Sequence, residues 1–130
     1  MKKAVSFYLF CILLILLSSC STFIKEEQVE SVMKREAYLY ETLIDVKYEE
    51  QVVLKKGTEV QIYFVASKNY LKVYAFPNDK GYLASEHYLI LYLFGDDFES
   101  EIFEEDKFYP MLDEVVQRKR ELTAEERERR

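Results

Sequence analysis

The sequence predicts a small α+β domain, mainly β-sheet with flanking helices, behind an N-terminal segment that is not part of the domain. Apolar and polar residues alternate from Glu59 to Ala66 and from Tyr70 to Ala75, which is the period of a strand with one buried face. Near the C-terminus the apolar residues recur at helical spacing instead. The N-terminal segment contains a long apolar run and precedes this domain.

The N-terminal segment has the order of a secretory signal peptide. Lys2 and Lys3 are followed by an apolar run, Ala4 to Leu17, which ends in Leu17-Ser18-Ser19-Cys20. These last four residues resemble the cleavage box of bacterial lipoproteins at every position. The resemblance implies cleavage between Ser19 and Cys20, so that residues 1–19 are the signal peptide. It also implies a lipid joined to the Cys20 sulfur through a thioether, and usually an acyl group on its amine.

An uncleaved membrane anchor is the alternative for this segment. The 21 residues from Ala4 to Ile24 carry no formal charge, which is roughly enough to span a bilayer as a helix. The strongly apolar part is shorter than a span, which favours the lipoprotein interpretation. Both interpretations place the domain outside the cytoplasm, because Lys2 and Lys3 hold the N-terminus inside. By the sorting rule of the lipoprotein family, Ser21 implies the outer membrane, with the periplasmic or surface face left open.

The charge of the mature chain limits its partners. Without residues 1–19 the chain has 111 residues, with 16 basic and 24 acidic side chains and a formal charge of −8. An acidic surface repels phosphates, which argues against nucleic acid as a partner. Cys11 leaves with the signal and Cys20 carries the lipid, so no disulfide is available in an oxidising compartment. Burial of apolar surface then has to stabilise a single domain.

The first part of the mature chain is expected to be a tether followed by strands. Residues 20–36 form a lipidated tether with a short helix, since Val29, Val32 and Met33 share a helical stripe. Residues 37–95 form the β domain. Its strands are expected at 37–43, 48–54, 59–66, 70–75 and 89–94. Both faces of the last strand are apolar, which predicts that it is central or covered by the C-terminal helix.

The turn between the third and fourth of these strands sets their register. Inward residues of both strands share a face only if the loop has an even number of residues. A two-residue turn at Lys68-Asn69 satisfies this condition and pairs Ala66 with Leu71 and Tyr63 with Tyr74. We expect Asn69 to adopt a left-handed conformation in this turn.

The C-terminal part is expected to be acidic and then helical. Residues 96–122 form an acidic segment and a helix from about residue 106 to 122, with Arg118, Lys119 and Arg120 at the helix C-terminus, where cations suit the dipole. Residues 123–130 form a charged tail that frays or extends into solvent.

Three stretches are similar to bacterial SH3-type domains. Leu54 to Val60 resembles the turn into the second strand of that family, Tyr70 to Val73 its third strand, and Gly81 to Leu89 its closing segment. The resemblance implies a small SH3-like barrel over residues 37–95. The chain has no tryptophan, and Tyr38 to Gln51 lacks the Arg-Ser-Gly-Pro run near the ligand groove of the family. The ligand residues of the family therefore do not transfer.

The sequence offers little chemistry for catalysis. His87 is the only histidine, and its neighbours Ser85 and Glu86 cannot form a relay merely by adjacency. The acidic stretch from Asp96 to Asp106 lacks the glycine-centred spacing of a helix-loop-helix calcium site. No cysteine-histidine metal cluster or phosphate-binding glycine loop is present in the sequence. We therefore expect no enzyme, no metal and no cofactor.

Binding is the function that the sequence favours. The expected register places Tyr63 beside Tyr74 on the outer face, with Tyr92 near, and such rings can hold extended peptide or glycan. The alternative is that these rings pack beneath the helices. We expect a non-enzymatic scaffold or accessory lipoprotein with an envelope protein as partner. Its layout is faintly similar to small lipoproteins associated with type II secretion. A peptidoglycan-binding module of SH3 type is the other hypothesis.

Overall fold

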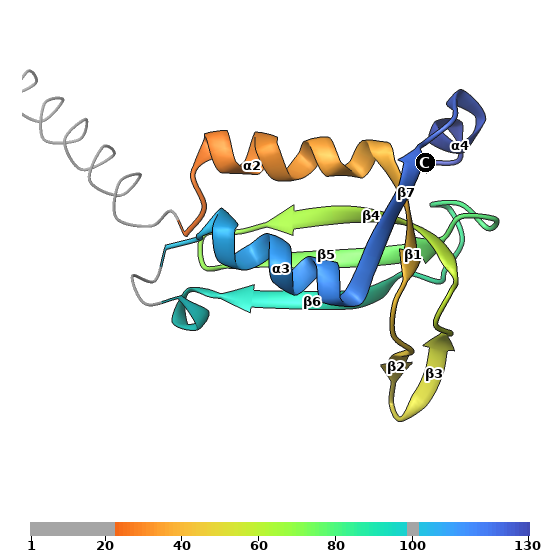
Figure 1. Ribbon diagram of the computed structural model, residues 1–130, viewed down its shortest axis with the longest axis horizontal. Helices are drawn as coiled ribbons and strands as arrows, with labels where there is room; N and C mark the ends of the chain where they lie inside the picture. The colour runs from red at the N-terminus through yellow and green to blue at the C-terminus, as the bar shows by residue number, and fades with distance from the viewer. Residues whose placement is uncertain (1–22, 99–101) are drawn as a thin grey trace, which may run out of the picture.

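The computed structural model describes residues 23–98 and 102–130 (Figure 1). The predicted signal peptide at residues 1–19, its cleavage site at Ser19 and the predicted lipid attachment at Cys20 lie outside the described residues. No helix within the described ranges is both long and apolar enough to cross a membrane.

Five strands form one antiparallel sheet in the order β6-β5-β4-β1-β7. Their bounds are β1 (Tyr38–Thr42), β4 (Glu59–Ala66), β5 (Tyr70–Pro77), β6 (Tyr88–Phe94) and β7 (Val116–Glu121). The predicted register of β4 and β5 is confirmed, since Ala66 pairs with Leu71 and Tyr63 with Tyr74. The backbone N–H of Ser67 donates to the Tyr70 carbonyl oxygen, which closes the two-residue turn between these strands.

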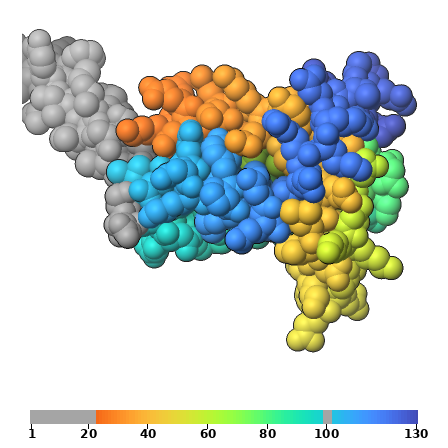
Figure 2. All heavy atoms as spheres, viewed as in Figure 1, coloured from red at the N-terminus to blue at the C-terminus, as the bar shows by residue number. Residues whose placement is uncertain are grey.

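A second, two-stranded sheet stands out from the body of the molecule (Figure 2). It consists of β2 (Val46–Tyr48) and β3 (Gln51–Leu54), so the strand expected over 48–54 is interrupted by a turn. Glu49 and Glu50 form this turn with φ of 50° and 68°. They are the only residues in the described ranges, glycine aside, with positive φ, so Asn69 does not adopt the left-handed conformation expected of it.

Two helices cover one face of the five-stranded sheet. They are α2 (Glu26–Met33), which continues as the 3-10 turn η1 (Lys34–Ala37), and α3 (Glu105–Val115). Val32 of α2 and Phe108 of α3 are buried against the inward residues of the strands, among them Ile62 and Phe64. The Phe64 and Phe108 rings meet edge to face with centroids 6.1 Å apart. Alternation predicts that Val60, Ile62, Phe64 and Ala66 of β4 point inward. Burial confirms this for the first three, whereas Ala66 is exposed and Gln61, expected to point outward, is buried.

The sheet is open, because its outer strands β6 and β7 pair with β5 and β1 and not with each other. The mainly β architecture with flanking helices is as predicted, whereas a closed SH3-like barrel is not formed. β6 is an edge strand rather than a central one, and its Leu93 is buried in the same core as Phe108 of α3, which agrees with the predicted alternative of cover by the C-terminal helix. A short 3-10 turn, η2 (Gly95–Asp97), follows it.

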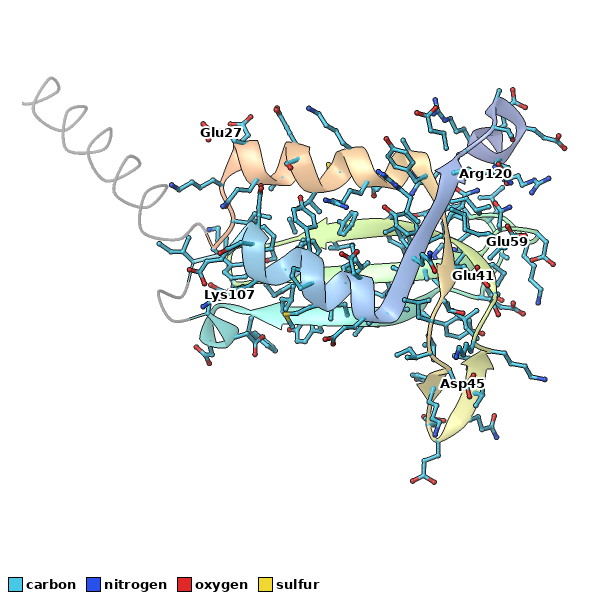
Figure 3. The ribbon with its side chains drawn as sticks, in the orientation of Figure 1. Glu27, Glu41, Asp45, Glu59, Lys107 and Arg120 are labelled. Carbon is cyan, nitrogen blue, oxygen red and sulfur yellow. The ribbon has the colours of Figure 1, made fainter. Side chains whose placement is uncertain are left out.

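The helix expected over residues 106–122 ends earlier and becomes a strand. α3 stops at Val115, and β7 begins at Val116 and pairs with β1 along five positions. Two adjacent β-branched valines favour extended backbone, and β1 offers an unpaired edge that a strand can satisfy. Lys119 then lies 3.7 Å from Glu41 and 3.5 Å from Glu59, two carboxylates labelled in Figure 3. The cations expected at a helix end are therefore part of a sheet edge.

The charged tail is folded rather than frayed. It contains α4 (Ala124–Glu128), whose first turn is closed by reciprocal bonds between Thr123 and Glu126. The buried Glu126 carboxylate accepts from Arg120 at 2.6 Å and 3.0 Å and from the Asn78 side-chain amide at 2.6 Å. Gln61 donates to the Glu126 carbonyl oxygen at 3.0 Å, so α4 is attached to the far end of β4.

Candidate functional site: the open face of the sheet

One face of the sheet carries neither α2 nor α3. Ile62 and Phe64 point toward these helices, so the residues that alternate with them on β4 point to the opposite face. The pairing of Tyr63 with Tyr74 carries this second face onto β5, and the register continues onto β6. We call this surface the open face; its members on the three strands are Tyr63, Val65, Tyr70, Lys72, Tyr74, Phe76, Leu89, Tyr92 and Phe94.

The first of two aromatic groups on the open face surrounds His87. The Tyr63 and Tyr74 rings are stacked, with centroids 5.3 Å apart and planes 14° apart. Tyr82 and His87 belong to the loop between β5 and β6, and both of their rings lie 5.5 Å from the Tyr63 ring. Phe76 completes the set with its centroid 5.2 Å from the His87 ring. We call these five residues the His87 group.

Both ring nitrogens of His87 are engaged. Nε2 lies 2.5 Å from the Tyr82 carbonyl oxygen, which can only accept, so Nε2 carries the proton. Nδ1 then accepts from the Tyr63 hydroxyl at 2.8 Å. Burial, and next the neighbouring Tyr82 and Tyr74 side chains, raise the pKa of Tyr63. The phenol therefore stays protonated at neutral pH and remains the donor of this hydrogen bond.

The neighbours of His87 in the sequence do not form a catalytic relay with it. The Glu86 carboxylate accepts from the Lys80 ammonium at 2.6 Å. The backbone N–H of His87 donates to the Ser85 carbonyl oxygen at 3.2 Å. Within the described part of the chain, no group of three or more His, Cys, Asp and Glu side chains could hold a metal ion. The contacts that the structure shows for His87 are with Tyr63, Tyr82 and Phe76.

The second aromatic group lies where β5 begins and β6 ends. The Tyr70 and Tyr92 ring centroids are 5.7 Å apart, and Phe94 meets Tyr92 edge to face at 4.2 Å. The Lys72 ammonium lies 4.9 Å and 5.1 Å from the centroids of the two tyrosine rings, a cation–π arrangement. We call Tyr70, Tyr92 and Phe94 the Tyr92 group.

The structure brings together two of the three tyrosines predicted to form a surface. Tyr63 and Tyr74 stack in the His87 group, whereas Tyr92 belongs to the other group. All three lie on the face away from α2 and α3, so they do not pack beneath these helices. Alternation already indicated that Tyr70 points outward. The position of Phe94 depends on the register of β5 and β6, which shifts at a bulge between Val73 and Tyr74 and has no signal in the sequence.

Apolar side chains beside the His87 group are exposed. Leu83 follows Tyr82 in the loop and is 93% exposed. Leu89 pairs with Tyr74 and is 43% exposed. Tyr82 itself also belongs to the exposed large apolar side chains. Leu89 and Tyr82 both border the His87 group, through Tyr74 and Tyr63, and exposed apolar side chains close together are typical of a surface that contacts another molecule.

This open face, with a ring cluster at each end and exposed leucines beside one of them, is the candidate functional site. Its side chains offer apolar contact area, phenol hydroxyl groups and the His87 imidazole. Comparisons of the chain with protein family models, with curated proteins and with solved structures found no match.

Proposed function

We propose that this chain is a lipid-anchored envelope protein that acts without catalysis, as a binding or accessory module for another envelope protein. The observation that carries the proposal is the exposed apolar surface around the His87 group, formed by Leu83, Leu89 and Tyr82. Aromatic rings backed by a rigid sheet bury a large area with little loss of conformational entropy, which suits protein recognition. The anchor itself is proposed from the lipoprotein box that ends at Cys20.

The partner is expected to present apolar side chains surrounded by basic ones. The mature chain carries a formal charge of −8, so a basic rim on the partner favours encounter over like-charged neighbours. Association with a secretion system, type II in particular, is supported by the similarity of layout to lipoproteins of that kind. The outer membrane is supported by Ser21.

A cell-wall role is the second candidate. We propose it together with the view that the sheet is an opened relative of the SH3-like barrel, supported by its five antiparallel strands and by bulges that bend them. Exposed aromatic rings also bind sugars, so the same open face suits peptidoglycan.

Photo-crosslinking in cells tests the proposal. p-Benzoylphenylalanine replaces Leu89 on the open face, and in a control it replaces Met111 on α3, which is 37% exposed. We expect one defined adduct from position 89, identified by mass spectrometry as an envelope protein, and none from position 111. The adduct should disappear when Leu83→Ser removes the exposed apolar side chain that follows Tyr82 in the loop.

Two outcomes would contradict the protein-binding proposal. Adducts of equal yield from positions 89 and 111 would mean that the open face is not a preferred surface. Adducts that contain muropeptides and persist in purified sacculi would favour the peptidoglycan candidate instead.

A further inference from the structure

The chain is tied into the fold almost immediately after the proposed lipid attachment site. The Phe23 side chain is buried between Phe98 and Phe103, with ring centroids 5.7 Å and 5.9 Å away. Its backbone N–H donates to the Lys68 carbonyl oxygen at 3.0 Å, and its carbonyl oxygen accepts from the Phe103 N–H at 2.9 Å. Only two residues, Ser21 and Thr22, lie between Cys20 and this fixed point, and the three Cα–Cα steps from Cys20 to Phe23 reach at most about 11 Å.

The elements next to Phe23 define one end of the molecule, which we call the anchor end. It contains the turn at Lys68 and Asn69, and the end of β6, where the Gly95 N–H donates to the Asn69 carbonyl oxygen at 3.3 Å. The starts of α2 and α3 lie at the same end, marked by Glu27 and Lys107 in Figure 3, whereas Asp45 beside the hairpin lies at the other. A two-residue link therefore holds this particular end near the lipid.

Apolar side chains are exposed at the anchor end. Phe94 and Ile102 are each 44% exposed. Phe94 is part of the Tyr92 group, whose tyrosines combine an apolar ring with a polar tip, the type of side chain found at membrane–water interfaces. Ile102 directly precedes Phe103, which is bonded to Phe23. These two residues flank the point from which the proposed anchor leaves the fold.

We propose that the anchor end rests on the bilayer that holds the lipid of Cys20, with Phe94 and Ile102 inserted into the interface. This inference rests on the proposed lipid anchor. Asp96, Asp97 and Glu104 lie at the same end together with Lys68 and Lys107, so the charges there are of both signs. The contact is therefore mainly apolar and suits zwitterionic lipid.

We call this orientation of the protein on the bilayer the seating, and it determines which surfaces are accessible to a partner. β4 runs over eight residues toward the anchor end, so its first residue, Glu59, lies about 23 Å from Ala66 along the strand and away from that end. The β2–β3 hairpin and α4 are therefore held away from the membrane. The open face stands beside the bilayer, with the Tyr92 group close to it and the His87 group farther out, available to a partner.

Single tryptophans can test the seating, because the chain has no tryptophan of its own. Phe94→Trp and Ile102→Trp place a probe at the anchor end. Tyr48→Trp is the matched control on the hairpin, where Tyr48 is 64% exposed. Each lipidated full-length protein is reconstituted in phosphatidylcholine vesicles whose acyl chains are brominated. We expect a blue shift and loss of most of the emission for probes at positions 94 and 102, and neither change at position 48.

The outcomes separate the seating from the anchor. Mass spectrometry for the lipid on Cys20 and flotation with the vesicles report the anchor independently of the tryptophans. A lipidated protein that floats while the probes at positions 94 and 102 behave like the control would overturn the seating and leave the anchor standing. A chain without lipid on Cys20 that fails to float would overturn the anchor and, with it, the seating.

Discussion

The two faces of the sheet hold aromatic rings of different kinds, and the difference separates stability from recognition. The face beneath α2 and α3 buries phenylalanines, including Phe64, Phe103 and Phe108, in contact with one another. The open face carries mainly tyrosines and a histidine, with a hydrogen bond between Tyr63 and His87. Of its two phenylalanines, Phe76 is buried against Tyr82 and His87, and Phe94 is partly exposed. Rings without a polar atom can be enclosed on all sides, whereas a phenol needs a partner for its hydroxyl group. The covered face therefore stabilises the fold, and the open face can contact other molecules.

The largest effect that we expect from this difference between the two faces is on the free energy of unfolding. Phe108→Ala removes a fully buried ring from the covered face and should lower the free energy of unfolding by about 3 to 5 kcal/mol. Tyr74→Ala removes a half-buried ring from the open face and should cost about 1 to 2 kcal/mol. Urea unfolding of the chain from residue 20, with Cys20→Ala, measures both. Equal costs would mean that the open face is as essential to the core as the covered one.

A smaller effect is expected where α4 closes the far end of the open face. Arg120, the Thr123 backbone N–H and Asn78 all bond to the Glu126 carboxylate and hold its pKa well below the usual range. A lowered pKa stabilises the fold above the ordinary pKa of a glutamate, and this contribution is lost as the pH falls below it. Glu126→Gln should therefore cost about 1 kcal/mol at pH 7, since Arg120 is partly exposed and solvent screens the pair.

The pH series of unfolding provides the decisive control for Glu126. Glu126→Gln should flatten the fall in stability on acidification, because the ionised side chain is no longer present. Glu125→Gln, at a neighbouring position that is well exposed, should leave the slope unchanged. If both variants behaved alike, the bonds of Glu126 would contribute nothing specific to the attachment of α4.

The contrast between β4–β5 and β7 shows what the sequence could predict. The register of β4 and β5 followed from alternation and from an even loop, which are local properties, and Tyr63 and Tyr74 followed from that register. β7 consists of Val116 and five polar or charged residues, so no local pattern identifies it as a strand. The unpaired edge of β1, which is distant in sequence, decides its conformation. The sequence predicts that Tyr92 is a surface residue, but its separation from Tyr63 and Tyr74 and its contact with Phe94 depend on the β5–β6 register, which a bulge sets.

One part of the C-terminal fold did have a signal in the sequence. Thr123 is followed three residues later by Glu126, which is the spacing of a helix capping box. The density of charge in the tail obscured this pattern, since such composition is typical of solvated segments. The ion pair between the buried Glu126 and the partly exposed Arg120 depends on tertiary contacts and has no local signal.

Glu36, in η1, differs from Glu126 in what shifts its pKa. Glu36 accepts from the Phe64 N–H at 3.0 Å and lies 3.9 Å from Arg130. Burial is the largest influence on Glu36 and raises its pKa, so the ionised form is disfavoured in the fold and stability from this group increases as the pH falls. Glu36→Gln keeps an acceptor for Phe64 and removes the charge. We expect unchanged or slightly higher stability at pH 7 in the same urea series, and a clear loss would contradict this assignment.

The smallest effect on stability is expected at Leu83, where the effect on binding should be large. Its side chain is 93% exposed and follows Tyr82, whose ring packs on the Tyr63 ring at 5.5 Å. Leu83→Ser should change the free energy of unfolding by less than about 0.5 kcal/mol, because exposed side chains contribute little to the fold. The same variant should abolish the crosslink from position 89. If Leu83 only stabilised the fold, losing the crosslink would require a loss of stability. Loss of the crosslink at unchanged stability would therefore show that Leu83 contacts the partner. A crosslink that survives would show that the leucines beside the His87 group are not the contact surface.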